Sequence, residues 1–140
     1  MKPLNKIDFL IAILSTFVFA FPMMAQPGKK VFHKAITNLS AKEFSAELDK
    51  TPKRTLLDVR SKEEFAEGHL PHALNINFFD DDFKARVGKL DKTTPIFVYC
   101  YAGGRSEEAS DILADMGFAR VINMTSGYRD WSKSGFPVEK

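Results

Sequence analysis

The segment PIFVYCYAGGRS, from Pro95 to Ser106, joins an apolar run to a glycine-rich turn. Ile96–Tyr99 are all apolar, a pattern that is typical of a fully buried strand. Cys100, the only cysteine of the chain, follows this run, and Gly103 and Gly104 come before a helical pattern. A buried strand, a tight loop and a helix in this order favour an α/β fold with a parallel sheet. The segment therefore predicts both the fold class and a place for chemistry.

The rest of residues 35–140 repeats this alternation of short apolar runs and helical patterns. Strands are predicted at 35–39, 54–59, 73–76, 95–100 and 121–124, and helices at 41–50, 62–67, 79–90, 105–116 and 128–133. Ser40 and Ser61 are placed to cap the first two helices, and Gly68 to end the second. The pattern predicts one α/β domain with a central parallel five-stranded sheet and helices on both faces. Ligands bind beyond the carboxyl ends of such strands, where Cys100 lies.

The predicted helix at 79–90 carries Phe79, Phe83 and Val87 at a spacing of four, which predicts one buried face. Three consecutive aspartates, 80–82, fall in its first turn, where the helix dipole favours negative charge. They lack the glycine and the terminal glutamate of a calcium-binding loop. We expect no metal site there.

Composition narrows the possible functions. The 140 residues suggest one domain, and a net charge of +2 is too small to indicate a nucleic-acid partner. A single cysteine excludes an internal disulfide and any zinc site that needs several thiolates. The roles that remain for Cys100 are packing in the core, pairing with another molecule, and chemistry.

Residues 1–25 have the order of a secretory signal: lysines, an apolar run and a small residue at the cleavage position. Cleavage after Ala25 fits best and would leave Gln26 first, with residues 26–34 as a flexible lead-in to a domain at 35–140. The alternative is an uncleaved membrane anchor. We expect an exported protein, periplasmic or secreted, that touches the membrane only through this segment. Cys100 would then have to be kept reduced in an oxidising compartment.

The loop after Cys100 is suited to an anion. Glycines allow a turn whose N–H groups point inward, and a helix N-terminus adds positive potential. Arg105 adds a full charge, so a thiol at the floor of this loop is expected to ionise readily. The residues fit attack on an anionic sulfur donor, with a persulfide intermediate, and attack on a phosphate ester. The alternative is a buried cysteine that only packs.

Three stretches resemble the single-domain rhodaneses, the thiosulfate sulfurtransferase family. LLDVRSKEEFAEGHLPHALNIN is similar to the family's upstream signature, CYAGGRS to its active-site loop and SGYRDWSKSGFPVE to its ending. The stretches occur in the family's order and span about residues 35 to 140. The resemblance implies a three-layer rhodanese-like domain that acts without a metal or organic cofactor.

The resemblance also implies roles for individual residues. Cys100 would carry the persulfide, and the backbone of Tyr101, Ala102, Gly103, Gly104, Arg105 and Ser106 would surround its outer sulfur. Arg105 would hold thiosulfate or stabilise the loop. Asp58 would brace the neighbouring loop and Arg60 would contact the substrate or that loop, unless the two form only a bracing ion pair. His69 would support its turn.

Two positions depart from the family's pattern. Tyr101 stands where Arg or Lys is common, which removes a positive charge and favours a donor other than thiosulfate or a partner protein. His72 stands where glycine is common, and a positive φ there would cost about 1 kcal/mol. We expect His72 to be a surface turn residue.

The expected function is transfer of a sulfur atom from a small anionic donor such as thiosulfate to cyanide or a thiol, by a monomer. Two alternatives remain. A phosphatase of this fold resembles a Cys-x5-Arg loop, whereas Cys100 and Arg105 form a Cys-x4-Arg loop that fits a sulfur atom better. A sulfur carrier, or partner-binding module, would keep the loop with little turnover of thiosulfate.

Overall fold

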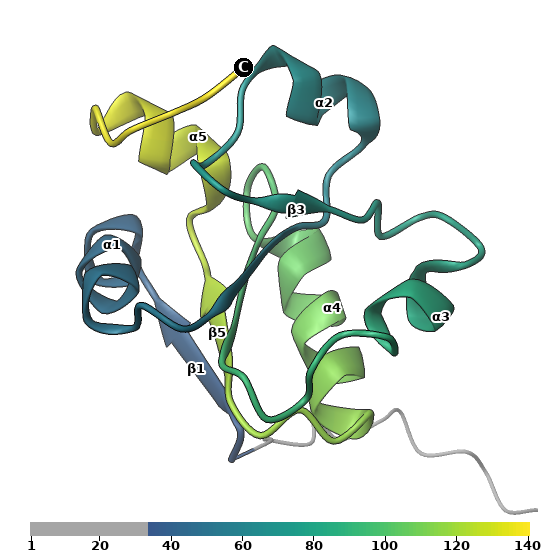
Figure 1. Ribbon diagram of the computed structural model, residues 1–140. Helices are drawn as coiled ribbons and strands as arrows, with labels where there is room; N and C mark the ends of the chain where they lie inside the picture. Colours follow the sequence, from purple (N-terminus) through teal and green to yellow (C-terminus); the bar gives the residue numbers. More distant parts are fainter. Residues whose placement is uncertain (1–33) are drawn as a thin grey trace, which may run out of the picture. The chain divides into compact units, whose positions relative to one another are not determined.

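The computed structural model describes residues 34–140, so the predictions for residues 1–33 lie outside the described part of the chain. Strands and helices alternate as predicted (Figure 1). The strands are β1 (Ile36–Leu39), β2 (Thr55–Asp58), β3 (Leu74–Asn75), β4 (Ile96–Tyr99) and β5 (Val121–Met124). The helices are α1 (Ala41–Lys50), α2 (Lys62–Glu67), α3 (Phe83–Val87), α4 (Gly104–Asp115) and α5 (Gly127–Lys133).

The five strands form one parallel sheet in the order β1-β5-β4-β2-β3. β4 lies in the middle, paired with β2 through Asp58 and Tyr99 and with β5 through Val98 and Asn123. All carboxyl ends therefore meet at one edge of the sheet. The predicted fold class is confirmed, and the loop after β4 lies at the centre of that edge.

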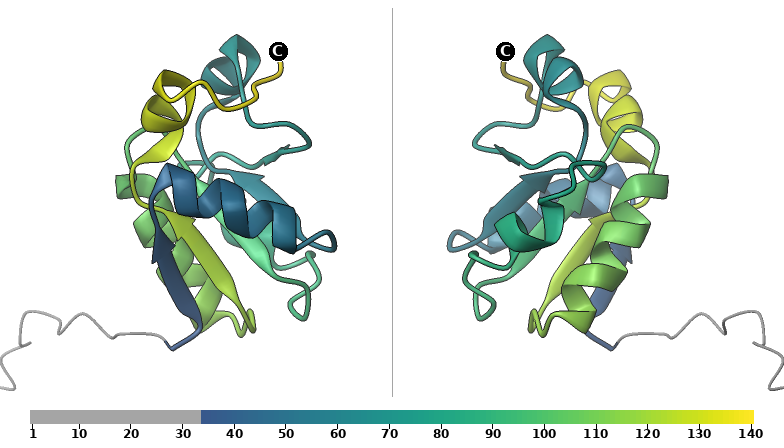
Figure 2. Two further views of the ribbon diagram at one scale, coloured as in Figure 1. Left: turned by 90° about the vertical axis from the view of Figure 1, so that its left-hand side faces the viewer. Right: turned by 90° about the vertical axis from the view of Figure 1, so that its right-hand side faces the viewer.

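Helices cover both faces of the sheet, as the views from the two sides show (Figure 2). On one face, side chains of α3 and α4 pack on Val98 and Val121, and Cys100 belongs to this cluster. On the other face, α1 and α5 pack on Phe97 and Ile122. Successive residues of β4 and β5 thus alternate between two cores, as the pleat of a strand requires. Because both faces are buried, the strands read as continuous apolar runs.

The first two helices begin where local chemistry predicts. Ser40 and Ser61 are N-caps, and each forms a capping box with the glutamate three residues later, Glu43 or Glu64. Each box satisfies two backbone N–H groups that a helix start would leave unpaired. These helix starts depend on residues within one turn, so the sequence predicts them well.

The prediction for residues 79–90 was wrong at both ends, because α3 runs only from Phe83 to Val87, and the three aspartates at 80–82 precede it instead of filling its first turn. Asn77 accepts a hydrogen bond from the N–H of Phe79 and donates one to Asp80, which holds this segment in turns. As a result Phe78, and not Phe79, packs against the core, and Phe79 is 71% exposed. These local hydrogen bonds of the Asn77 side chain outweighed the helical spacing of the apolar residues.

Two smaller features complete the description. His72 has a φ of 65°, so its turn takes the left-handed conformation that a glycine at this position would adopt more easily. Within the part of the chain that the structure describes, none of the helices combines the length and the apolar composition needed to cross a bilayer.

Candidate functional site

Cys100 follows the last residue of β4 and its side chain is 1% exposed. Its Sγ accepts a hydrogen bond of 3.0 Å from the backbone N–H of Gly103. The loop therefore turns back over the sulfur within three residues. A donor aimed at sulfur stabilises negative charge on it, which is the charge that a thiolate or a persulfide carries.

Close backbone contacts hold this loop in place. Gly103 has a φ of 102°, and a Cβ there would collide with the carbonyl oxygen of Thr125, at the end of β5. A Cβ at Gly127, whose φ is 68°, would collide with the carbonyl of Tyr101. Both positions therefore require glycine. Gly104 is different, because nothing lies within 4 Å of the place its Cβ would occupy.

The start of α5 is bonded directly to the loop. The N–H of Tyr128 donates to the carbonyl of Cys100 at 2.8 Å, and the N–H of Arg129 donates to Tyr101 at 3.0 Å. On the other side, the carbonyl of Gly103 accepts from the N–H of Glu107 and from the hydroxyl of the buried Ser106. The loop is thus tied to α4 and α5, so its N–H groups have fixed directions.

The N-terminus of α4 supplies the positive potential. The first N–H groups of a helix have no carbonyl partner within that helix, and the dipole places partial positive charge there. In α4 these groups follow Gly103, directly after the loop that covers Cys100. Of the six residues predicted to form the cradle, Gly103 and Ser106 are buried, Arg105 is half-buried, and Tyr101, Ala102 and Gly104 are exposed.

Arg105 binds Glu64 through two hydrogen bonds of 2.8 and 2.9 Å. The hydrogen bond from Arg105 outweighs partial burial and lowers the pKa of Glu64 to about 2, and the same pair raises the pKa of Arg105. Arg105 therefore joins α4 to α2. Of its two predicted roles, this contact matches stabilisation of the loop.

Asp58 and Arg60 form a buried ion pair. The Arg60 side chain is 2% exposed, its Nη2 donates to Asp58 Oδ2 at 2.7 Å, and it also donates to the carbonyl of Gly68. The Tyr128 ring covers the guanidinium, 4.1 Å from its centroid. Burial acts to lower the pKa of Arg60, but the hydrogen bond and charge of Asp58 outweigh it and raise that pKa. The pair braces the segment between β2 and α2. Contact of Arg60 with a substrate stays a prediction.

His69 contacts the segment on either side of its turn. Its Nδ1 lies 2.9 Å from the carbonyl of Phe65, and its ring stacks on the Phe65 ring. Its backbone pairs with Glu139 in the C-terminal segment. His72 is exposed, and its N–H donates to Glu139.

Three residues of the site were missed by sequence reasoning: Glu64, Tyr99 and Tyr128. Glu64 is recognisable only as a capping residue, because Arg105 lies 41 positions away. The Tyr99 hydroxyl accepts the N–H of Leu70, and burial, with the charge of Asp58, raises the pKa of Tyr99. The only local signals for the two tyrosines are the continuous apolar run of β4 and the Gly-Tyr pair at 127–128.

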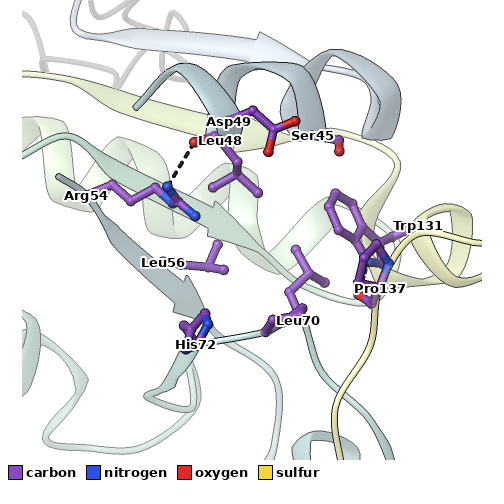
Figure 3. A pocket seen from close by; sticks show the side chains of 10 residues that line it. Ser45, Leu48, Asp49, Arg54, Leu56, Leu70, His72, Trp131 and Pro137 are labelled. Atoms are coloured by element: carbon purple, nitrogen blue, oxygen red, sulfur yellow. Dashed lines mark hydrogen bonds between the residues drawn. The ribbon is translucent and has the colours of Figure 1, made fainter. Parts of the chain in front are cut away.

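A surface cavity of about 400 Å³ lies beside the loop, lined by Arg60, Glu64, Glu67, Tyr101 and Tyr128. A second cavity, of about 130 Å³, lies on the α1 face (Figure 3). Leu56, Leu70 and Trp131 border that cavity, and Arg54 at its rim donates to the carbonyl of Leu48. Of these two cavities, the first borders the loop after Cys100, through Tyr101.

Comparison with known proteins agrees with this site. Residues 40–134 match the family described as the Rhodanese-like domain. A sulfurtransferase of Allochromatium vinosum is 28% identical over 103 residues, which cover 74% of this chain and 94% of that protein. YrkF of Bacillus subtilis, whose name marks it as a candidate sulfur carrier, is 32% identical over 98 residues. The match covers 70% of this chain but only 52%, about half, of YrkF.

Solved structures show the same fold. The rhodanese-like domain of the Anabaena sp. Alr3790 protein, determined by NMR, superposes with a TM-score of 0.64 at 26% identity. The superposition covers 76% of this chain and 79% of that one. The matched region includes the loop after β4, the buried Asp58–Arg60 pair and α5. The chain belongs to the rhodanese-like domain family.

Proposed function

We propose that this protein is a sulfurtransferase that carries sulfur on Cys100. The observation that carries the proposal is the hydrogen bond from the Gly103 N–H to the Cys100 Sγ, at the N-terminus of α4. It places a donor, a helix dipole and the only thiol of the chain together, in a chain of the rhodanese-like family. The sulfurtransferase and sulfur-carrier names of its relatives support sulfur as the group that is moved.

In the first half-reaction the Cys100 thiolate attacks the outer sulfur of thiosulfate. A bond forms between Sγ and that sulfur, the S–S bond of thiosulfate breaks, and sulfite leaves with the bonding electron pair. The persulfide anion then carries the negative charge. The N–H groups of the loop stabilise this charge, which would be costly to bury without donors.

In the second half-reaction cyanide or a thiolate attacks the outer sulfur of the persulfide. The Sγ–S bond breaks, its electron pair returns to Cys100, and thiocyanate or a new persulfide leaves. Cys100 is regenerated as a thiolate, so the two halves form a double-displacement cycle. The chain's own groups supply the nucleophile and the donors for both steps.

The positive potential for the donor would come mainly from α4. Arg105 and Arg60 are each paired with a carboxylate, so neither presents an uncompensated charge. The same pairing weakens the phosphatase alternative, since Arg105 would have to leave Glu64 to bind a phosphate. We therefore expect thiosulfate to bind with modest affinity, through N–H groups more than through side-chain cations.

A sulfur carrier with slow thiosulfate turnover is the second candidate. The name of YrkF and the exposed Tyr101, where a cation would favour thiosulfate, support it. Both candidates use the Cys100 persulfide and differ only in the donor that loads it. Residues 1–25 would direct either activity to the periplasm or the outside, which N-terminal sequencing of the exported protein would test.

The test is intact mass spectrometry of the full chain before and after addition of thiosulfate, with cyanide added last. We expect a gain of one sulfur atom that cyanide removes, and no gain in Cys100→Ser. If the free thiol reacts with iodoacetamide but takes no sulfur from thiosulfate, the carrier candidate gains support, and organic persulfides are tested next. A Cys100→Ser variant that still forms thiocyanate would overturn both candidates.

A further inference from the structure

We propose that the cavity beside the loop binds the cationic group of the sulfur acceptor, and that this acceptor is a small aminothiol. Glu67 and Tyr101 would contact the ammonium group. The role as an acceptor site rests on the sulfur transfer proposed above, whereas the preference for a cation follows from the cavity alone.

Among the residues that the structure describes, the charges around the cavity leave one carboxylate without a counter-ion. Arg60 is paired with Asp58, and Glu64 is paired with Arg105. Glu67 is exposed, and its side-chain carboxylate makes no hydrogen bond or ion pair with any residue in the range 34–140. Glu67 therefore gives the cavity a negative charge.

The position of Glu67 on its helix increases this effect. Glu67 is the last residue of α2, and the last turn of α2 contains no basic residue. A carboxylate at a helix C-terminus adds to the negative end of the dipole and is unfavourable there. A cation bound at this point would relieve both charges. Glu64 and Glu67 are three residues apart, so they share one face of α2.

Tyrosine rings complete the cavity. Tyr101 is 45% exposed, and Tyr128 lines the cavity beside it. Aromatic faces attract ammonium groups more strongly than they attract neutral or anionic groups. One face of Tyr128 is occupied by the guanidinium of Arg60, whereas Tyr101 makes no ring contact with the residues described. We therefore assign the cation contact to Tyr101 together with Glu67.

The cavity adjoins the loop that covers the sulfur. Tyr101, which lines the cavity, follows Cys100 directly, and Arg105 of the same loop is bonded to Glu64 of the cavity wall. An aminothiol anchored by its ammonium group would present its thiolate to the persulfide. The thiolate attacks the outer sulfur, the Sγ–S bond breaks, its electron pair returns to Cys100, and the acceptor leaves as a persulfide.

The first test measures sulfur transfer from Cys100 that has been loaded beforehand, with loading checked by mass. Three acceptors of similar size are compared: cysteamine, which is cationic, 2-mercaptoethanol, which is neutral, and 3-mercaptopropionate, which is anionic. Because these thiols differ in intrinsic reactivity, the quantity compared is the change in their rate ratios between variants. Glu67→Gln is the test variant and Glu108→Gln the control, since Glu108 is an exposed glutamate of α4 outside this cavity.

We expect Glu67→Gln to lower the cysteamine-to-mercaptoethanol ratio about fivefold and to raise the mercaptopropionate-to-mercaptoethanol ratio. Glu108→Gln should leave both ratios unchanged, and Tyr101→Leu should lower the first ratio without changing the second. If both glutamate variants shift the ratios equally, the effect is one of net charge and the proposal is overturned.

The second test does not depend on sulfur transfer. Cys100 without added sulfur is modified with aminoethyl and sulfonatoethyl methanethiosulfonate, and the ratio of the two rates is measured in the wild type and in Glu67→Gln. A ratio that depends on Glu67, in a protein that takes up no sulfur, would keep the cation site and overturn its role with an acceptor. Sulfur uptake with no dependence on Glu67 in either test would overturn this inference alone. If Cys100 takes up no sulfur and reacts with neither methanethiosulfonate reagent, both proposals are overturned.

Discussion

Arg105 and Glu64 form a two-bond ion pair that joins the first turn of α4 to α2 beside the loop of Cys100. The side chains are 22% and 32% exposed, so water screens the pair only in part. The planar guanidinium meets both carboxylate oxygens, a geometry that fixes direction as well as distance. The pair is therefore placed to hold the loop, and its contribution can be measured.

We expect a double-mutant cycle on this pair to give a coupling of about 1 kcal/mol. The variants are Arg105→Gln, Glu64→Gln and the double variant, each examined by urea unfolding. Gln at position 64 can still accept the N–H of Ser61, so the capping box is kept. A coupling near zero would show that the pair orders nothing. As a matched control, the exposed pair Arg86 and Asp80, at 3.5 Å, should show weaker coupling.

The same pair predicts how stability depends on pH. The pKa of Glu64 falls to about 2 in the folded protein, below its unfolded value of 4.5, because Arg105 binds the charged form. The folded state therefore holds fewer protons, so its stabilisation is complete above about pH 5 and is lost as pH falls from 4.5 towards 2. The difference in unfolding free energy between wild type and Glu64→Gln should shrink over this range. A difference that grows on acidification would contradict the assignment.

Gly103 and Gly104 are predicted to respond oppositely to alanine. Gly103→Ala combines a positive φ with a Cβ that overlaps the carbonyl oxygen of Thr125, so the loop must shift. Sulfur uptake by Cys100 should then fall at least tenfold. The stability of this variant should fall by about 2 kcal/mol. Gly104→Ala meets open space in the first turn of α4 and should keep uptake, with stability equal or higher by about 0.5 kcal/mol. Mass spectrometry of sulfur uptake and urea unfolding test the two effects, and equal loss in both variants would contradict the assigned geometry.

Asp58→Asn is expected to destabilise the protein by about 3 kcal/mol or more, because it leaves the Arg60 guanidinium buried without a counter-charge. The double variant Asp58→Asn with Arg60→Met removes that charge and should recover part of the loss. Thermal and urea unfolding provide the measurement. A single variant as stable as wild type would mean that Arg60 reaches solvent in the folded protein.

His72→Gly should raise the unfolding free energy by about 0.5 kcal/mol. His72 has a φ of 65°, where a side chain is strained, and glycine removes that strain although it loosens the unfolded chain. His72→Ala is the control, because it deletes the ring and keeps the strained φ. If both variants change stability equally, the effect belongs to the ring and not to the backbone.

The sequence predicted features that depend on neighbouring residues. The capping boxes at Ser40 and Ser61 are complete within four residues, and both helices begin where expected. The apolar run before Cys100 places the cysteine at a strand end without any knowledge of the partners of that strand. The start of α3 was missed because Asn77 and Asp80 compete with the helix through side-chain hydrogen bonds that apolar spacing does not reveal.

Tertiary structure decided which charges meet and which remain alone. By itself, the sequence determined an α/β domain with a lone cysteine in a glycine-rich loop, because strand burial, helix caps and turns are set by short-range interactions. It could not show that Arg105 is neutralised by Glu64, 41 positions away, or that Arg60 is buried under Tyr128. Those contacts arise only when the parallel sheet brings the carboxyl ends of its strands together. Among residues 34–140, they leave the Glu67 carboxylate without a counter-ion in the cavity that Tyr101 also lines.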